Sequence, residues 1–261
     1  MASPVKAKKH LGQHFLVDLN IAQKIVNALP QDDLAIIEIG PGTGVLTQYL
    51  IEKENFTAFD IDQESIDFLK EKYPAHAHKI QFQDFLEADL KPFALKGNFK
   101  VLGNFPYNIS TQIMFKVLEH RADVSALVGM FQKEVAVRIA EKPGTKAYGI
   151  LSVLLQAFYK IEYLFTVSEH VFNPPPKVKS AVIRLTRNTT DKLNCDEDLF
   201  FKVVKASFNQ RRKTVRNSVK ILSGNSIVDS IYLDKRAEQL SVEQFVELTN
   251  AIENSLKNKQ H

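Results

Sequence analysis

Short apolar runs alternate with helical patterns along the chain up to about Leu185. The runs are bounded by polar or turn residues, and the segments between them carry apolar residues at helical spacing. Strands that alternate with helices predict a parallel, doubly wound α/β sheet. The predicted strands are Ala35–Ile39, Phe56–Asp60, Lys79–Gln83, Lys100–Gly103, Ala126–Phe131, Ile161–Val167 and Ser180–Leu185, and the predicted helices are Thr43–Lys53, Asp62–Lys72 and Ser110–Glu119.

The pattern changes after about Thr186. Arg187–Asp198 is polar, which is typical of a linker, and beyond it the apolar residues follow helical spacing with few strand signals. We therefore expect an α/β domain over residues 1–186, with helices on both faces of its sheet, and a small all-helical domain over residues 187–261. The predicted helical segments of the second domain are Leu199–Asn209, Thr214–Leu222, Lys235–Leu240 and Val242–Glu253.

The composition of the chain excludes several classes of protein. Of the 261 residues, 44% are hydrophobic and 25% are charged, which are ordinary globular values. A single cysteine, Cys195, excludes an internal disulfide and a cysteine-based zinc ribbon. No apolar stretch follows the first lysine, and the most apolar run, Ile150–Leu155, is far shorter than the roughly 20 residues that span a bilayer. We expect a cytoplasmic protein that binds neither a membrane nor a metal.

The basic residues are clustered, although the net charge of +4, from 34 basic and 30 acidic residues, is small. Residues 200–220 hold seven Lys or Arg and no acid, and residues 1–17 hold three lysines, two histidines and no acid. Such acid-free segments favour contacts with a polyanion such as a nucleic acid. The alternative is a solvated helix face and a frayed terminus.

A glycine-rich loop, Glu38–Gly44, directly follows the first predicted strand. Glycines there let the backbone approach a ligand, and doubly wound sheets bind nucleotides at this carboxyl edge. Asp60 lies 20 residues after Gly40, a spacing that suits a carboxylate on a ribose diol. Asp84 and Phe85, after the third strand, suit the edge and face of an adenine.

The glycine spacing indicates which ligand fits. Gly-x-Gly-x-Gly differs from the dinucleotide pattern Gly-x-Gly-x-x-Gly. The loop therefore favours a ligand without a pyrophosphate, such as S-adenosylmethionine, over a nicotinamide cofactor. The remaining alternative is a plain tight turn that binds nothing.

The fourth strand ends in Gly103–Ser110, which contains an Asn-Phe-Pro-Tyr turn. Proline fixes the backbone there, so the neighbouring carbonyls point in set directions. The side-chain oxygen of Asn104 and the carbonyl of Phe105 or Pro106 suit the two N–H bonds of an exocyclic amine, and Tyr107 offers a flat face to its base. Both acceptors would stabilise the charge that develops on nitrogen during methyl transfer. The alternative is a structural turn with a buried tyrosine.

With these motifs, the chain resembles the KsgA family of small-subunit rRNA adenine dimethyltransferases over nearly its whole length. Each matching stretch is modest evidence alone, but their order and number argue against chance. The matching stretches are Leu11–Leu16, Glu38–Gly44, Gly103–Ser110, Gln132–Val135, Lys146–Gly149, Phe172–Val178, Ser180–Leu185 and Phe208–Lys213.

The resemblance implies a Rossmann-like methyltransferase domain, a helical C-terminal domain and S-adenosylmethionine as methyl donor. It also implies the substrate, a pair of adjacent adenosines in a hairpin loop near the 3′ end of 16S rRNA, each of which receives two methyl groups, in free RNA or in an assembling 30S particle. His14 stands where many bacterial members have Asn, and Asp60 stands where Glu is common. The implied cofactor contacts fall on His14, Leu16, Gly40, Gly42, Asp60, Asp84 and Asn104.

The resemblance also implies how the target base is held. Phe172 matches the family's aromatic residue before three prolines, which we expect to form an exposed, stiff loop. Tyr107 and Phe172 are then expected to clamp the faces of a flipped-out base. The alternative is that Phe172 anchors the loop in the core. The residues expected to act in catalysis are Asn104, Pro106, Tyr107 and Phe172.

Four basic residues are candidates for contacts with RNA phosphates. Lys133 follows the fifth strand and either contacts a phosphate or pairs with a neighbouring acid. The other three follow the predicted helix Leu199–Asn209 and have no acid near them in the sequence, so phosphates would supply their counter-charges. These residues are Arg211, Arg212 and Lys213.

Two other functions stay open. Enzymes that methylate one adenine of large-subunit rRNA, and confer macrolide resistance, share the glycine loop and a similar asparagine motif, but Lys146–Gly149 and Phe208–Lys213 favour the small-subunit family. A nonenzymatic RNA-binding factor, such as a ribosome-assembly checkpoint, is the rival from another class, and the intact motif from Asn104 to Tyr107 argues that catalysis is retained. We expect a monomer.

Overall fold

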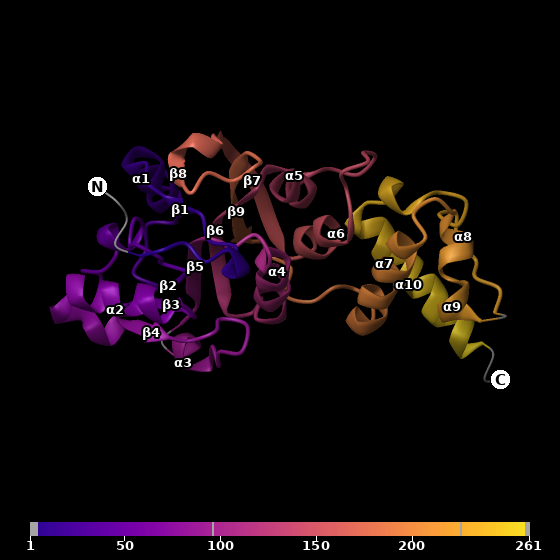
Figure 1. The fold of residues 1–261 in the computed structure, drawn as a ribbon. Coiled ribbons are helices and arrows are strands. Elements are labelled where there is room, and N and C mark those ends of the chain that lie inside the picture. The colour runs from indigo at the N-terminus through magenta and orange to yellow at the C-terminus, as the bar shows by residue number, and fades with distance from the viewer. Residues whose placement is uncertain (1–4, 96, 225, 259–261) are drawn as a thin grey trace. The chain divides into compact units, whose positions relative to one another are not determined.

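The structure is a computed structural model that describes residues 5–95, 97–224 and 226–258. Seven strands form one mixed sheet in the order β4-β3-β2-β5-β6-β9-β7, which confirms the α/β fold class (Figure 1). A separate two-stranded sheet joins β1 and β8. The strands are β1 (Phe15–Leu16), β2 (Ala35–Ile39), β3 (Phe56–Asp60), β4 (Ile80–Phe82), β5 (Phe99–Asn104), β6 (Val124–Gln132), β7 (Tyr159–Val167), β8 (Phe172–Asn173) and β9 (Ser180–Arg187).

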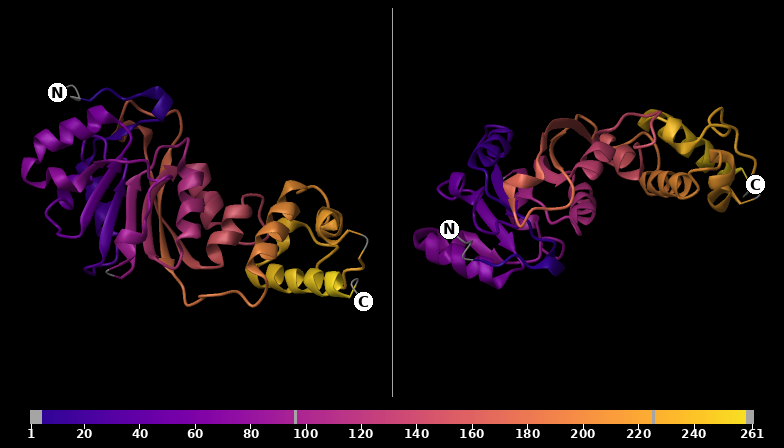
Figure 2. Two further views of the ribbon diagram at one scale, coloured as in Figure 1. Left: turned by 90° about the horizontal axis from the view of Figure 1, so that it is seen from below. Right: turned by 45° about the horizontal axis from the view of Figure 1, so that its top comes forward.

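Helices connect the strands, and the chain after β9 is helical (Figures 1 and 2). In the described part of the chain, no helix has the length and the apolar character needed to cross a membrane. The α-helices are α1 (Leu19–Asn27), α2 (Gln63–Lys72), α3 (Lys91–Ala94), α4 (Ser110–Glu119), α5 (Lys133–Ala140), α6 (Ile150–Gln156), α7 (Glu197–Asn209), α8 (Val215–Ser218), α9 (Lys220–Ser223) and α10 (Val242–Lys257). The 3₁₀ helices are η1 (Lys9–Leu11), η2 (Thr47–Tyr49), η3 (Pro74–Lys79), η4 (Glu169–Val171) and η5 (Ala237–Gln239).

The order of the strands reverses beside β2. This strand pairs in parallel with β3 on one side and with β5 on the other. From β2 the chain runs outward to β3 and β4, and then returns to β5 and β6 on the opposite side. Because these strands are parallel, their carboxyl ends share one edge, and a reversal of strand order opens a crevice at that edge. The ends of β2, β3 and β5 are thereby placed where a ligand is expected.

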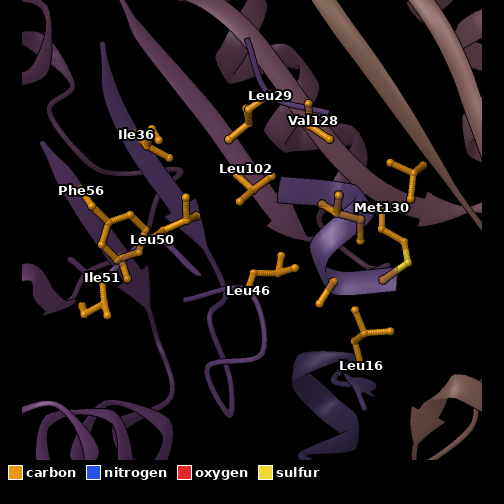
Figure 3. Packing of buried hydrophobic residues seen from close by; sticks show 14 of the residues in the cluster. Leu16, Leu29, Ile36, Leu46, Leu50, Ile51, Phe56, Leu102, Val128 and Met130 are labelled. Carbon is orange, nitrogen blue, oxygen red and sulfur yellow. The ribbon is translucent and has the colours of Figure 1, made fainter. Parts of the chain in front are cut away.

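Apolar side chains on one face of the sheet pack in a cluster with residues of α1 and of the turn after the glycine loop (Figure 3). Ile36, Leu102 and Val128, from three neighbouring strands, contribute to this cluster. Successive residues of a strand face opposite sides, so Phe59 of β3 points to the other face. There its ring meets the ring of Phe93 in α3, with 5.7 Å between the centroids. Apolar contacts thus cover both faces of the sheet.

The contacts between Cα atoms divide the chain into two compact units. The first unit comprises residues 1–136 and 161–187, with most of the sheet, and the second comprises residues 137–160 and 188–261. In the second unit α7 packs against α10, with Phe200 and Phe245 buried. The domain boundary between residues 186 and 187 stays a prediction.

The predicted helix Thr43–Lys53 is wrong. The segment forms turns around η2 instead. Gly44 has a φ of 81°, outside the helical region, so an α-helix cannot run on from Thr43 through this residue. Farther along, the amide of Gln48 bonds to the carbonyl of Gly44, four residues back, whereas the amide of Tyr49 bonds to that of Leu46, three residues back. No continuous α-helical ladder forms.

Two predicted helices of the second unit are shorter than expected. Thr214–Leu222 is split into α8 and α9, because Val219 between them has φ −88° and ψ −5°, which breaks the regular helical geometry. Lys235–Leu240 contains only the 3₁₀ helix η5. The helices α7 and α10 agree with their predicted segments to within a few residues.

Candidate active site

A pocket opens at the carboxyl edge of the sheet, beside the reversal of strand order. Its walls come from residues 11–15, the glycine loop after β2, residues 59–61, residues 83–86 and residues 104–109. The sequence-predicted residues that line it are His14, Gly40, Gly42, Asp60, Asp84, Asn104, Pro106 and Tyr107. Leu16 instead lines a smaller pocket that shares Gly40 and Asn104 with the main one. Segments far apart in the sequence therefore meet at one site.

Asp60 holds the glycine loop in place. Its Oδ2 accepts a hydrogen bond from the amide of Gly42 at 3.2 Å, and its Oδ1 accepts one from the amide of Asp62 at 2.9 Å. Gly42 has a φ of 55°, and a Cβ there would lie 2.8 Å from the ring of Phe15. Burial raises the pKa of Asp60, and these backbone hydrogen bonds oppose the rise. The carboxylate faces the pocket and keeps lone pairs for a ligand hydroxyl.

Asp62 is a part of the site that sequence reasoning missed. Its carboxylate caps α2 by accepting from the amide of Glu64 at 3.1 Å, and it also accepts from Gln13 Nε2 at 2.9 Å and forms an ion pair with Lys8. Burial raises its pKa, but the hydrogen bonds from Gln13 and Lys8 outweigh that effect and lower it. Lys8 of the basic N-terminal segment is thus paired with acids of this chain. Contacts between that segment and a polyanion stay a prediction, and residues 1–4 of the segment lie outside the described residues.

Glu38 is a second residue without a predicted role. It is the fourth residue of β2, lies between the buried Ile37 and Ile39 and is only 1% exposed, and Thr47 Oγ1 donates to its Oε2 at 2.8 Å. Burial is the main cause that raises the pKa of Glu38 to about 8, and the charge of Asp60 adds to it. Near neutral pH this carboxyl is therefore mostly protonated. An acid within an apolar strand is the sequence signal that identifies it.

The Asn104 side chain is oriented by the N-terminal segment. Its Nδ2 donates a hydrogen bond to the backbone carbonyl of His14 at 2.8 Å. This contact identifies the nitrogen side of the amide, so the carbonyl oxygen Oδ1 points the other way. Among the hydrogen bonds of the described residues, none uses Oδ1. Asn104 thus presents an acceptor at the edge of the pocket.

Two glycines make room for the ring of Phe105, which anchors the turn after Asn104. A Cβ at Gly103 would lie 2.6 Å from this ring, and one at Gly129 of β6 would lie 2.2 Å from it. The ring also meets that of Phe131 edge-on, with 5.1 Å between centroids. A larger residue at Gly129 would displace Phe105 and with it the turn. Sequence reasoning missed Gly129 because it lies on a different strand.

Tyr107 is held at its hydroxyl and at its ring. The hydroxyl lies 2.6 Å from Ser180 Oγ, and the ring stacks with the ring of His14, with 5.5 Å between centroids and 30° between the planes. Burial raises the pKa of Tyr107, and the hydrogen bond with Ser180 opposes this rise. The tyrosine therefore stays neutral and presents a fixed flat surface.

Phe172 does not line the pocket with Tyr107. It is 4% exposed and belongs to the hydrophobic cluster on the sheet, and in β8 it pairs with Leu16 of β1. The loop after it is only partly exposed, because Pro176 is buried as well. This geometry favours the core anchor that the sequence left as an alternative, and a stacking role for Phe172 stays a prediction.

The basic residues of the second unit fall into two groups. Arg211 Nε lies 3.8 Å from Glu238 Oε2, and Arg216 forms an ion pair with Asp234 at 3.0 Å. No acid lies within residues 200–220, but these two arginines are paired with acids 27 and 18 residues farther along the chain. This favours the alternative of pairing within the helical domain for Arg211, and its contact with RNA stays a prediction. Arg212 and Lys213, the other two basic residues of the matching stretch Phe208–Lys213, are exposed. Lys133, at the start of α5 in the first unit, is exposed as well.

The sequence matches one family and its relatives over nearly the whole chain. The family described as Ribosomal RNA adenine dimethylase matches residues 5–254. The Ribosomal RNA small subunit methyltransferase A of Bacteroides thetaiotaomicron is 54% identical over 257 residues, which are 97% of this chain and 96% of that protein. The protein of the same name from Cytophaga hutchinsonii is 58% identical over 253 residues, which are 95% of this chain and 98% of that protein.

Solved structures have the same fold. A dimethyladenosine transferase from Plasmodium falciparum aligns with a TM-score of 0.74 at 24% identity, over 93% of this chain and 98% of that one. The 23S rRNA methyltransferase ErmE aligns with a TM-score of 0.64 at 25% identity, over 92% of this chain and 99% of that one. Because the family match and the relatives above 50% identity span nearly the whole sequence, the chain belongs to the ribosomal RNA adenine dimethylase family.

Proposed function

We propose that this protein transfers methyl groups from S-adenosylmethionine to the exocyclic amines of two adjacent adenosines in a hairpin loop near the 3′ end of 16S rRNA. Membership of the adenine dimethylase family supports the reaction. The substrate is supported by the identities, which are 54% and 58% with relatives named for the small subunit and 25% with the 23S rRNA enzyme. The products are dimethyladenosines, made during assembly of the small subunit.

The residues of the pocket fit S-adenosylmethionine. Asp60 places a buried carboxylate where a ribose diol would donate to it, and Asp84 lies at the end of the neighbouring strand. Apolar side chains beside these acids, among them Ile61 and Phe85, offer surfaces to an adenine. When bound, S-adenosylmethionine supplies a methyl group on a sulfonium, which is a good leaving group. Neither a metal nor a nucleophilic side chain is needed for that chemistry.

The fixed amide of Asn104 is the single observation that carries the proposal. With Nδ2 bonded to His14, Oδ1 is left to accept one N–H of the adenine amine. The carbonyl of Pro106 already accepts from the amide of Ile109 at 3.2 Å, so the carbonyl of Phe105 is the better second acceptor. Two preoriented acceptors localise the amine lone pair and stabilise the positive charge that develops on nitrogen. Pro106 fixes the backbone that aims the second acceptor.

The contacts with RNA are assigned to Tyr107 in the pocket, to Phe172 and to basic residues outside the pocket. Tyr107 offers its ring to the flipped-out base, while Phe172 would need to leave the core before it could cover the other face. The exposed side chains of Lys133, Arg212 and Lys213 are suited to phosphates. Arg211, beside Glu238, contributes less of its charge to such contacts.

The experiment combines the purified protein with labelled S-adenosylmethionine and 30S particles that lack the modification. We expect label in dimethyladenosine at two adjacent positions of 16S rRNA, found by digestion and mass spectrometry. Purified 50S particles serve as the parallel substrate. Label in 23S rRNA alone would favour the macrolide-resistance class of enzyme, and binding to 30S particles without transfer would favour a nonenzymatic assembly factor.

A further inference from the structure

The side chain of His14 lies where three segments of the first unit meet. Phe15 of β1 pairs with Asn173 of β8, and this antiparallel register places His14 opposite Pro174. His14 Nδ1 lies 2.8 Å from the carbonyl oxygen of Pro174, which can only accept, so Nδ1 carries a proton and donates. On its other side, the imidazole stacks with Tyr107. The ring therefore links the proline loop to the turn that carries the methyl acceptor site.

Among the described residues, the Tyr107 side chain makes one hydrogen bond and one ring contact, and the ring contact is with His14. The Tyr107 hydroxyl bonds to Ser180 Oγ at 2.6 Å, and this contact acts on the far end of the side chain, not on the faces of the ring. The imidazole supports the ring itself, at a centroid distance of 5.5 Å. Stacked aromatic pairs of this kind restrict orientation as well as adding contact area. The orientation of the Tyr107 ring is thus set by both contacts together.

We propose that His14 is a positioning residue for the acceptor adenine, and that its imidazole sets the plane of Tyr107. This inference rests on the proposed function, because it assigns a role within that same reaction. The backbone carbonyl of His14, which orients Asn104, is present whatever side chain stands at this position. Substitutions at His14 therefore test the imidazole apart from the Asn104 contact.

The test uses a graded series at this position in the full-length protein. His14→Phe keeps an aromatic ring but cannot donate to Pro174, His14→Asn keeps a donor but has no ring, and His14→Ala has neither. His10→Ala is the matched control, because His10 is an exposed histidine in the same segment. For each protein we would measure kcat and KM for 30S particles at saturating S-adenosylmethionine, the Kd for S-adenosylmethionine by calorimetry, and the melting temperature.

We expect kcat to fall in the variants that lack an aromatic ring at position 14. His14→Ala and His14→Asn should lower kcat about two- to tenfold, as expected for one lost aromatic pair, while the Kd for S-adenosylmethionine changes less than about twofold. His14→Phe should recover most of that loss, and His10→Ala should match the wild type. A merely structural role would lower the melting temperature without this order of kcat values.

Other outcomes would overturn the inference. A Kd weakened about tenfold in all three variants, with wild-type kcat at saturation, would make His14 a ligand of the methyl donor. His14→Phe as slow as His14→Ala would show that the ring is not the support. If His14→Ala does not fold, His14→Phe against His14→Asn decides. A wild-type protein that transfers no label would overturn the proposed function as well, whereas an active wild type with an unaffected His14→Ala would overturn this inference alone.

Discussion

The pocket of the first unit and the basic segment of the second unit (residues 200–220) use polar residues in opposite ways. In the pocket, each polar group is fixed by the protein itself, as Asp60 is by the amide of Gly42 and Asn104 by the carbonyl of His14. In the basic segment, Arg212 and Lys213 are exposed. Fixed groups suit the binding of one small molecule and the orientation of one amine. Exposed charges suit a phosphate backbone, whose contacts vary in position. Substitutions in the two regions should therefore have separable effects.

The largest effect is expected for Asn104→Ala. Removing Oδ1 takes away one of two acceptors for the adenine amine, and loss of one preorganised group lowers rates by about a hundredfold. Methyl transfer to unmodified 30S particles, measured with labelled donor at saturating concentration, checks this. Asn98→Ala is the matched control, because Asn98 is an exposed asparagine of the first unit that does not line the pocket. Transfer near the wild-type rate in a folded Asn104→Ala protein would contradict the mechanism.

Asp60→Ala should weaken binding of S-adenosylmethionine by roughly ten- to a hundredfold, because a hydrogen bond to a charged group is lost. Part of the loss would arise through the glycine loop, since Gly42 also loses its acceptor. Calorimetry measures the affinity, and Asp67→Ala, which removes an exposed acid on α2, is the control. An unchanged affinity in a folded Asp60→Ala protein would remove Asp60 from the site.

Glu38 predicts how the free energy of unfolding depends on pH. Its pKa is raised from 4.5 to about 8, so the stability that its proton adds is fully present below about pH 4.5 and is lost as the pH rises to about 8. Glu38→Gln removes this dependence. Between about pH 6 and pH 8 the wild type should lose about 1–2 kcal/mol of unfolding free energy relative to the variant. Denaturant melts of both proteins test the sign, and parallel curves would refute it.

The basic segment should respond to salt instead. Arg212→Ala with Lys213→Ala should weaken binding to 30S particles and lower the slope of log affinity against log salt by about 1.5, for two lost phosphate contacts.

Arg211→Ala should lower the melting temperature instead, because it leaves the buried Oε2 of Glu238 without the arginine that lies 3.8 Å from it. Binding across a salt series, with melting curves, separates the two variants. If the double variant keeps the wild-type slope of log affinity against log salt, Arg212 and Lys213 do not contact RNA phosphates.

Much of the fold could be predicted from the sequence, because buried parallel strands are short apolar runs. Ala35–Ile39 and Phe56–Asp60 are β2 and β3 with the predicted bounds. The failure at Thr43–Lys53 has a local cause, since the positive φ of Gly44 interrupts a segment with good helical spacing. The helices α1, α5 and α6 were not predicted. In α6 the residues from Leu151 to Leu155 are all buried, so no polar face marks the helical period, whereas α1 buries one face with Ala22 and Ile25 and could have been recognised from its spacing.

The predicted pocket residues share a signal, which is their position at the ends of parallel strands. That rule places Asp60, Asp84 and Asn104 at one edge before any contact is known. Partners distant in the sequence could not be foreseen. Lys8 meets Asp62 across 54 positions, and Arg211 meets Glu238 only because of how the helices of the second unit pack. A count of charges within a window misses such pairs.

The central claim is that this chain dimethylates two adjacent adenosines of 16S rRNA. Mass spectrometry of 16S rRNA from cells that lack the protein tests it most directly. We predict that both adenosines are unmethylated in those cells, and that the wild-type chain restores the dimethyl groups whereas Asn104→Ala does not. Dimethyladenosines that persist unchanged in the absence of the protein would contradict the claim.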